Sequence, residues 1–230
     1  MCFLNVNTFP QSEDYYMKRF IGCYNRSVIL TYMSIVAAVI GIWQIAFHTD
    51  NSKLPFVMAC LIIAGVCDMF DGKVARRCKR TEIEKDFGIQ LDSLADTVSF
   101  VVFPIVVLIK TCTTGEFYIP LNSNVKIILV HAVSMAYIIT GVTRLAWFNI
   151  TTTGKTTYFS GLPVTSVAAI IPIAYLLFRN LPFFLEAMLI VYAVIAVLFV
   201  LNFKLKKPTG LVFVFFSIAA TILITILFIK

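Results

Sequence analysis

Long apolar stretches occupy most of this chain, and they limit its fold more than any other feature. A helix of about 20 apolar residues crosses a hydrocarbon layer of about 30 Å. Spanning segments of this length are helices because the bilayer offers no partner for exposed backbone N–H and C=O groups. The sequence therefore predicts an all-α fold, a polytopic membrane helical bundle. We expect about seven transmembrane helices, at residues 27–47, 54–71, 88–110, 125–148, 161–178, 182–203 and 210–229.

The same pattern divides the chain into three parts. Residues 1–26 precede the first span, and the mixture of aromatic and charged residues at 12–25 indicates either a helix in the headgroup region or a polar cytoplasmic cap. Residues 27–203 contain six helices that we expect to form one membrane domain. Residues 204–230 add a C-terminal transmembrane helix.

The distribution of Lys and Arg predicts the orientation of the bundle. With a cytoplasmic N-terminus, fourteen of the 19 basic residues fall on the inner side and five on the outer side, in agreement with the positive-inside rule. We therefore expect an integral protein of the plasma membrane whose basic loops face the cytoplasm. Because topology explains the net charge of +7, we expect no binding of nucleic acid.

Four aspartates lie beside the second and third expected spans, within CDMFDGKVARR and GIQLDSLADTVSF. We expect Asp68 and Asp71 to end one span on the cytoplasmic side, and Asp92 and Asp96 to begin the next span on that side. Spacings of three and four residues place each pair on one helix face. A charge inside a bilayer costs about 2.5–3.5 kcal/mol, so such residues face a partner, a cavity or a metal ion. The pattern predicts that the four carboxylates converge on one site.

The chemistry of these residues favours a metal and a phosphate-containing ligand. Oxygen ligands without a nearby Cys or His are typical of sites for Mg²⁺ or Mn²⁺. Four carboxylates are enough for two ions about 3.5–4 Å apart, a pair that clamps phosphates in displacement reactions. Gly72 lets a ligand approach closely, and Arg76 offers a planar fork suited to phosphate oxygens. The alternative is an interfacial salt-bridge network without a ligand.

The arrangement D-x-x-D-G-x-x-A-R followed by G-x-x-x-D-x-x-x-D resembles the signature of the CDP-alcohol phosphotransferase family. Members of this family are membrane enzymes in which a hydroxyl group displaces CMP from a CDP-activated lipid or alcohol. Ser93 and the runs TRLAWFN and YFSGLPV are similar to the branch that uses serine, whereas Val101 and Trp147 depart from that branch. The signature residues are Asp68, Asp71, Gly72, Ala75, Arg76, Gly88, Asp92 and Asp96.

The resemblance implies transfer of a phosphatidyl group from CDP-diacylglycerol to the hydroxyl of L-serine, giving phosphatidylserine and CMP. It also implies a homodimer. Asp96 would act as general base and shared metal ligand, beside two Mg²⁺ or Mn²⁺ ions. The remaining implied roles are metal binding for Asp68, Asp71 and Asp92, and CDP binding for Gly72, Ala75, Arg76 and Thr31.

Three of the candidate residues have competing explanations. Thr31 either lies near the nucleotide or bonds back to its own helix. Arg144 either contacts the substrate phosphate or serine carboxylate, or forms a structural ion pair. Lys155 either contacts phosphate or is solvated in a loop. His48 and His131 are expected near the outer ends of their spans, so an aspartate has to serve as the base.

Two other functions are compatible with parts of the pattern. The first is a phosphotransferase of the same family with inositol phosphate or glycerol phosphate as acceptor. The second is a divalent-cation transporter, since intramembrane carboxylates also line ion paths. A transporter predicts acidic residues through the depth of the membrane, whereas here they gather at one side.

Overall fold

The computed structural model describes residues 22–47, 51–120, 122–151, 158–206 and 210–229. Four of its helical segments are long and apolar enough to cross a membrane, and shorter apolar helices complete the bundle. Within the described residues, this confirms the predicted all-α membrane bundle. The long segments are α1 (Ile29–Phe47, preceded by the turn η3, Arg26–Val28), α2 (Leu54–Arg77, preceded by η4, Asn51–Lys53), the joined segment Glu82–Thr114 and α5 (Ser123–Thr151).

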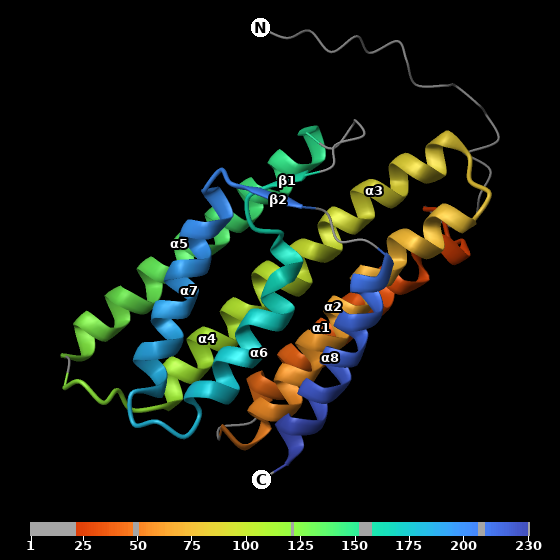
Figure 1. Cartoon of the computed structure of the whole chain (residues 1–230). Helices are drawn as coiled ribbons and strands as arrows, with labels where there is room; N and C mark the ends of the chain where they lie inside the picture. Colours follow the sequence, from red (N-terminus) through yellow and green to blue (C-terminus); the bar gives the residue numbers. More distant parts are fainter. Residues whose placement is uncertain (1–21, 48–50, 121, 152–157, 207–209, 230) are drawn as a thin grey trace, which may run out of the picture.

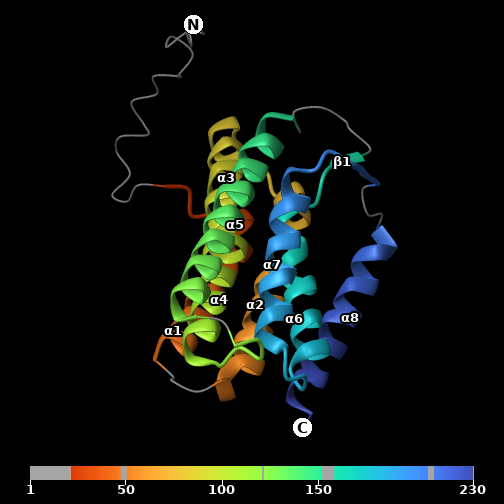
Figure 2. The same cartoon turned by 90° about the vertical axis from the view of Figure 1, so that its left-hand side faces the viewer.

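The shorter helices are α6 (Val167–Phe178, preceded by η6, Val164–Ser166), α7 (Phe184–Val200) and α8 (Gly210–Phe228). In the bundle α1 packs against α2, and α5 packs against α7. Helix α2 also contacts α6 and α8, so that α8 lies along the side of the bundle away from α5 (Figures 1 and 2). The four aspartates lie on α2 and the joined segment.

A short two-stranded antiparallel sheet, which the sequence did not predict, lies at one end of the bundle (Figure 1). Strand β1 (Tyr158–Ser160) pairs with β2 (Lys204–Lys206), and Phe159 is opposite Leu205. The pairing joins the chain that follows α5 to the chain that follows α7. It fixes the ends of these two helices near each other.

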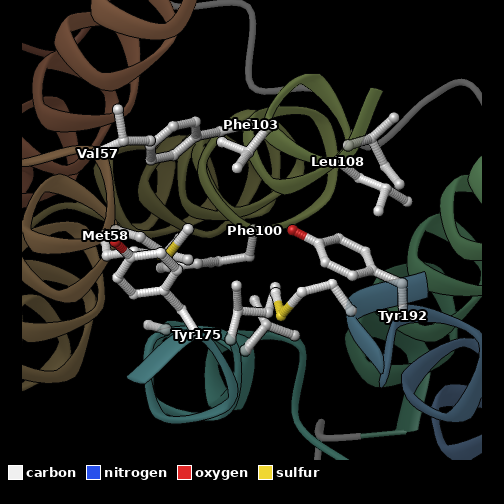
Figure 3. Close-up of a cluster of buried hydrophobic side chains, with 14 of the residues drawn as sticks. Val57, Met58, Phe100, Phe103, Leu108, Tyr175 and Tyr192 are labelled. Atoms are coloured by element: carbon white, nitrogen blue, oxygen red, sulfur yellow. The ribbon is translucent and has the colours of Figure 1, made fainter. Parts of the chain in front are cut away.

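The buried core lies between α2, the joined segment, α6 and α7 (Figure 3). Lipid tails are as apolar as the side chains, so membrane helices associate through close packing rather than a hydrophobic force. Small residues make this packing possible: a Cβ on Gly65 would overlap Ala168, and a Cβ on Gly41 would overlap the ring of Phe103. Labelled core side chains in Figure 3 are Val57, Met58, Phe100, Phe103, Leu108, Tyr175 and Tyr192.

The joined segment begins earlier than the predicted span 88–110. Helix α3 (Glu82–Asp96) starts at a capping box in which Thr81 Oγ1 accepts from the Glu84 N–H at 3.2 Å and Glu84 Oε2 accepts from the Thr81 N–H at 2.9 Å. This first part is amphipathic and extends beyond the apolar run. Asp92 and Asp96 consequently lie inside a helix rather than at its start, and α2 likewise continues past Asp71 to Arg77.

A π-helical turn, η5 (Thr97–Val102), connects α3 to α4 (Phe103–Thr114) directly after Asp96. The Phe103 N–H donates to the carbonyl of Val98, five residues earlier. Pro104 explains the wider turn, because its ring clashes with the carbonyl four residues before it and it has no N–H to donate. That carbonyl belongs to Phe100, and it accepts instead from Tyr137 Oη at 2.9 Å.

Candidate active site

Three of the predicted aspartates come together where α2 and α3 face each other. One carboxylate oxygen from each of Asp68, Asp92 and Asp96 lies within 4.8 Å of the other two. Oxygens about 3–4 Å apart share one Mg²⁺ at bond lengths of about 2.0–2.1 Å, so a small side-chain adjustment closes this cluster on an ion. The donor set, which contains only carboxylate oxygens, fits Mg²⁺ or Mn²⁺.

Asp71, the fourth aspartate, is buried beside this cluster. Its Oδ2 accepts a hydrogen bond of 3.1 Å from Thr31 Oγ1, which reaches across from α1. The carboxyl group of Asp71 also lies within interaction distance of the Asp92 carboxyl group. The carboxyl groups of Asp68 and Asp96 form a second such pair. The structure therefore gives Thr31 a partner that the sequence did not indicate, and its contact with the nucleotide stays a prediction.

Two signature glycines leave open space beside the aspartates. Among the described residues, the one atom within 4 Å of a Cβ placed on Gly72 is Nη1 of Arg76, at 3.6 Å. At Gly88 the corresponding atom is Nη1 of Arg80, also at 3.6 Å. Each glycine thus leaves room for a ligand next to a guanidinium group. The half-buried Ala75 places only a methyl group on the same face of α2.

Arg80 was not singled out from the sequence, where it is one of several basic residues between α2 and α3. Its Nε is enclosed and has no hydrogen-bond partner in the described part of the chain. A basic residue at this point is suited to an anionic group of a ligand at Gly88.

Arg144 is buried in α5 and holds the backbone turn that follows β1. Its Nε donates to the Leu162 carbonyl at 2.9 Å and its Nη2 to the Gly161 carbonyl at 3.4 Å. Gly161 has φ +78°, and a Cβ there would lie 2.8 Å from the Leu201 carbonyl oxygen, so glycine is required. Contact of Arg144 with substrate stays a prediction, and Lys155 lies outside the described residues.

The two positions that depart from the serine-using branch have different surroundings. Val101 is fully buried, and its Cγ2 lies 3.0 Å from a Cβ placed on Gly141, so the side chain fills space that the glycine in α5 leaves open. Trp147 is 52% exposed on α5. Val101 is therefore a packing residue within the bundle.

A hydrogen bond connects α5 to α3 next to the carboxylates. Asn149 Nδ2 donates to Ser93 Oγ at 2.7 Å, and both side chains are partly buried. Ser93 follows Asp92 directly in the sequence. The C-terminal end of α5 is thereby fixed beside the site.

His131 lies far from the aspartates, as predicted. It occurs 18 residues before Asn149 on the same helix, a distance of about 27 Å at 1.5 Å per residue. A cavity of about 490 Å³ between α4 and α5 is lined by His131, Lys126 and Ile109, and by none of the predicted site residues. His48 lies outside the described residues.

The fold and the site define a membrane-embedded helical protein with clustered carboxylates for a divalent cation. The family model of the CDP-alcohol phosphatidyltransferases matches residues 24–202, and the chain belongs to this family. The resemblance predicted from the signature is confirmed. Members of the family generally depend on a divalent metal ion, and the aspartate cluster is a suitable site for one.

Similar curated proteins carry related names. The chain is 38% identical over 129 residues to a CDP-diacylglycerol–serine O-phosphatidyltransferase of Helicobacter pylori, covering 55% of this chain and 49% of the relative. It is 35% identical over 137 residues to the protein of that name from Saccharomyces cerevisiae, covering 53% and 44%. An archaetidylserine synthase of Methanothermobacter thermautotrophicus is 33% identical over 144 residues, covering 63% and 56%. The chain thus spans about half the length of these relatives.

Proposed function

We propose that the protein transfers a phosphatidyl group from CDP-diacylglycerol to the hydroxyl of L-serine, giving phosphatidylserine and CMP. The observation that carries the proposal is the convergence of Asp68, Asp92 and Asp96 from two helices beside the buried Asp71. The names of the relatives differ in the lipid but share serine, which favours serine as acceptor over inositol phosphate or glycerol phosphate.

In the proposed reaction, the serine hydroxyl oxygen attacks the phosphorus attached to diacylglycerol. Asp96 takes the hydroxyl proton, the new O–P bond forms, and the bond from that phosphorus to the CMP oxygen breaks with its electron pair leaving on CMP. Two Mg²⁺ or Mn²⁺ ions held by Asp68, Asp71, Asp92 and Asp96 would neutralise the phosphates and the departing charge.

Other residues in this proposal bind and orient. Thr31 holds Asp71 in place through its hydrogen bond, because a ligand carboxylate is positioned by its own partners. Gly72 and Ala75 leave room for the CDP group, and Arg76 contacts a phosphate oxygen. Arg144 orients the turn at Gly161 and, with Lys155, stays a weaker candidate for contact with substrate.

We also propose that the protein lies in the plasma membrane and that its site faces the cytoplasm. Support comes from the fourteen basic residues predicted on that side. The catalytic unit would comprise residues 27–203, with residues 1–26 and 204–230 as additions. A homodimer, which the family resemblance implies, is part of the proposal.

The test uses the purified full chain in lipid nanodiscs with CDP-diacylglycerol and Mn²⁺. Labelled L-serine, inositol phosphate and glycerol 3-phosphate are supplied separately, and CMP and lipid products are measured. We expect labelled phosphatidylserine. Asp96→Asn should lower the rate by about 10²–10⁴-fold, because a general base contributes this much. The matched control is Asp86→Asn, which changes an exposed aspartate of the same helix and should leave the rate unchanged.

Two results would contradict the proposal. CMP release without incorporation of serine would favour another acceptor. Metal uptake into proteoliposomes that survives Asp96→Asn would favour a transporter.

A further inference from the structure

We propose that Asn149 recognises the amino group of the acceptor, that Ser93 recognises its carboxylate, and that the pair so selects serine. This inference rests on the proposed function. Its starting point is the 2.7 Å hydrogen bond from Asn149 Nδ2 to Ser93 Oγ, which places two uncharged polar side chains between α3 and α5. Both side chains are partly buried, so a small polar molecule at the site can reach them.

The position of Ser93 matches the size of the acceptor. Ser93 precedes Asp96 by three residues in α3, so their Cβ atoms lie about 5–6 Å apart on neighbouring parts of the helix surface. In L-serine, two carbon atoms separate the hydroxyl oxygen from the amino nitrogen. A serine hydroxyl that donates to Asp96 therefore brings its amino and carboxylate groups within a few ångströms of Ser93.

The hydrogen-bonding capacity of the pair is complementary to a zwitterion. Asn149 uses Nδ2 in its bond to Ser93, which leaves Oδ1 to accept from an ammonium group. Ser93 Oγ accepts from Asn149 and can donate its own proton to a carboxylate. Because Thr97 Oγ1 donates to the Ser93 carbonyl at 2.8 Å, the backbone at this point is fixed as well.

The same groups disfavour the competing acceptors. An amide oxygen repels the phosphate of glycerol phosphate or inositol phosphate, and uncharged side chains provide nothing to neutralise it. Arg144, the cation of α5 that could do so, directs its guanidinium group to the carbonyls of Leu162 and Gly161. The Ser93–Asn149 pair thus attracts serine and offers no cation to a phosphorylated alcohol, whereas the guanidinium groups of Arg76 and Arg80 lie beside Gly72 and Gly88.

The experiment measures steady-state kinetics of Ser93→Ala and Asn149→Ala in nanodiscs with Mn²⁺. We expect KM for L-serine to rise about 10- to 100-fold in each variant, since each substitution leaves a charged group of the acceptor without its partner. KM for CDP-diacylglycerol should stay within about twofold. Ser93→Thr, which keeps the hydroxyl, should restore the KM for serine, and Thr143→Ala on an exposed part of α5 is the matched control.

Acceptor analogues distinguish recognition from a structural role. Ethanolamine lacks the carboxylate, so Ser93→Ala should use it as well as the unmodified protein does. 3-Hydroxypropionate lacks the amino group, so Asn149→Ala should use it equally well. A clamp that only joined α3 to α5 would instead impair all acceptors alike.

The outcomes separate this inference from the proposed function. Absence of serine transfer by the unmodified protein would overturn both. Serine transfer with an unchanged KM for serine in both alanine variants would overturn the inference alone. A parallel rise in KM for CDP-diacylglycerol, or equal losses with all acceptors, would also overturn it.

Discussion

The hydroxyl of Tyr137 replaces a backbone donor that Pro104 removes, and its deletion should destabilise the bundle. Tyr137 is fully buried, and its Oη donates to the Phe100 carbonyl at 2.9 Å. In an α-helical pattern that carbonyl would accept from the N–H of residue 104, which proline lacks. Tyr137→Phe therefore leaves a buried carbonyl without this donor.

We expect the free energy of unfolding to fall by about 1–3 kcal/mol, the range for a buried hydrogen-bonding group that loses its partner. Hydrogen bonds between membrane helices average only about 0.6 kcal/mol when alternative partners are at hand. Pro104 removes the local alternative, which favours the larger range. At about 2–4 °C per kcal/mol for a chain of this size, the Tm should fall by about 2–12 °C.

The assay is thermal unfolding of purified variants in one detergent, arranged as a double-mutant cycle with Pro104→Ala. The alanine returns an N–H that can donate to Phe100, so Tyr137→Phe should cost less than half as much in that background. Tyr192→Phe is the matched control. Tyr192 Oη donates to the Pro104 carbonyl at 2.9 Å, but that carbonyl lies inside α4, where the N–H four residues later can serve it.

Equal costs of Tyr137→Phe with and without Pro104 would refute the argument. So would a loss for Tyr192→Phe as large as that for Tyr137→Phe. Either result would mean that the contribution of the Tyr137 hydroxyl does not depend on the backbone donor that Pro104 removes.

Three further changes test the site and the packing. Thr31→Val removes the hydrogen bond to Asp71 and should raise the Mn²⁺ concentration for half-maximal CMP release about 10-fold; an unchanged titration curve would exclude this role for Thr31. Chelation by EDTA should abolish CMP release, and added Mn²⁺ or Mg²⁺ should restore it; activity that persists would contradict a metal requirement. Gly41→Ala adds a methyl group that overlaps the ring of Phe103, so the free energy of unfolding should fall by about 1–3 kcal/mol, as measured by thermal unfolding. An unchanged Tm would show that α1 shifts freely.

The length of the apolar stretches and the spacing of the aspartates are local properties, and the sequence determined both. Spans and signature could be read without a partner segment because hydropathy and i, i+3 or i, i+4 spacing depend only on neighbours along the chain. Helix α3 starts six residues before the predicted span, because an amphipathic extension does not register as an apolar span. The local signal that would have found it is the capping box of Thr81 and Glu84.

The partners of individual polar side chains were decided only by the tertiary structure. Thr31 bonds to Asp71 across 40 residues, Arg144 to the Leu162 carbonyl across 18, and Asn149 to Ser93 across 56. Such pairs depend on the rotation and crossing of helices, which side-chain packing over the whole bundle sets. The sequence could therefore name the chemistry of the site from its aspartates, whereas the residues that orient it and that select the acceptor emerged from the packing of α1, α3 and α5.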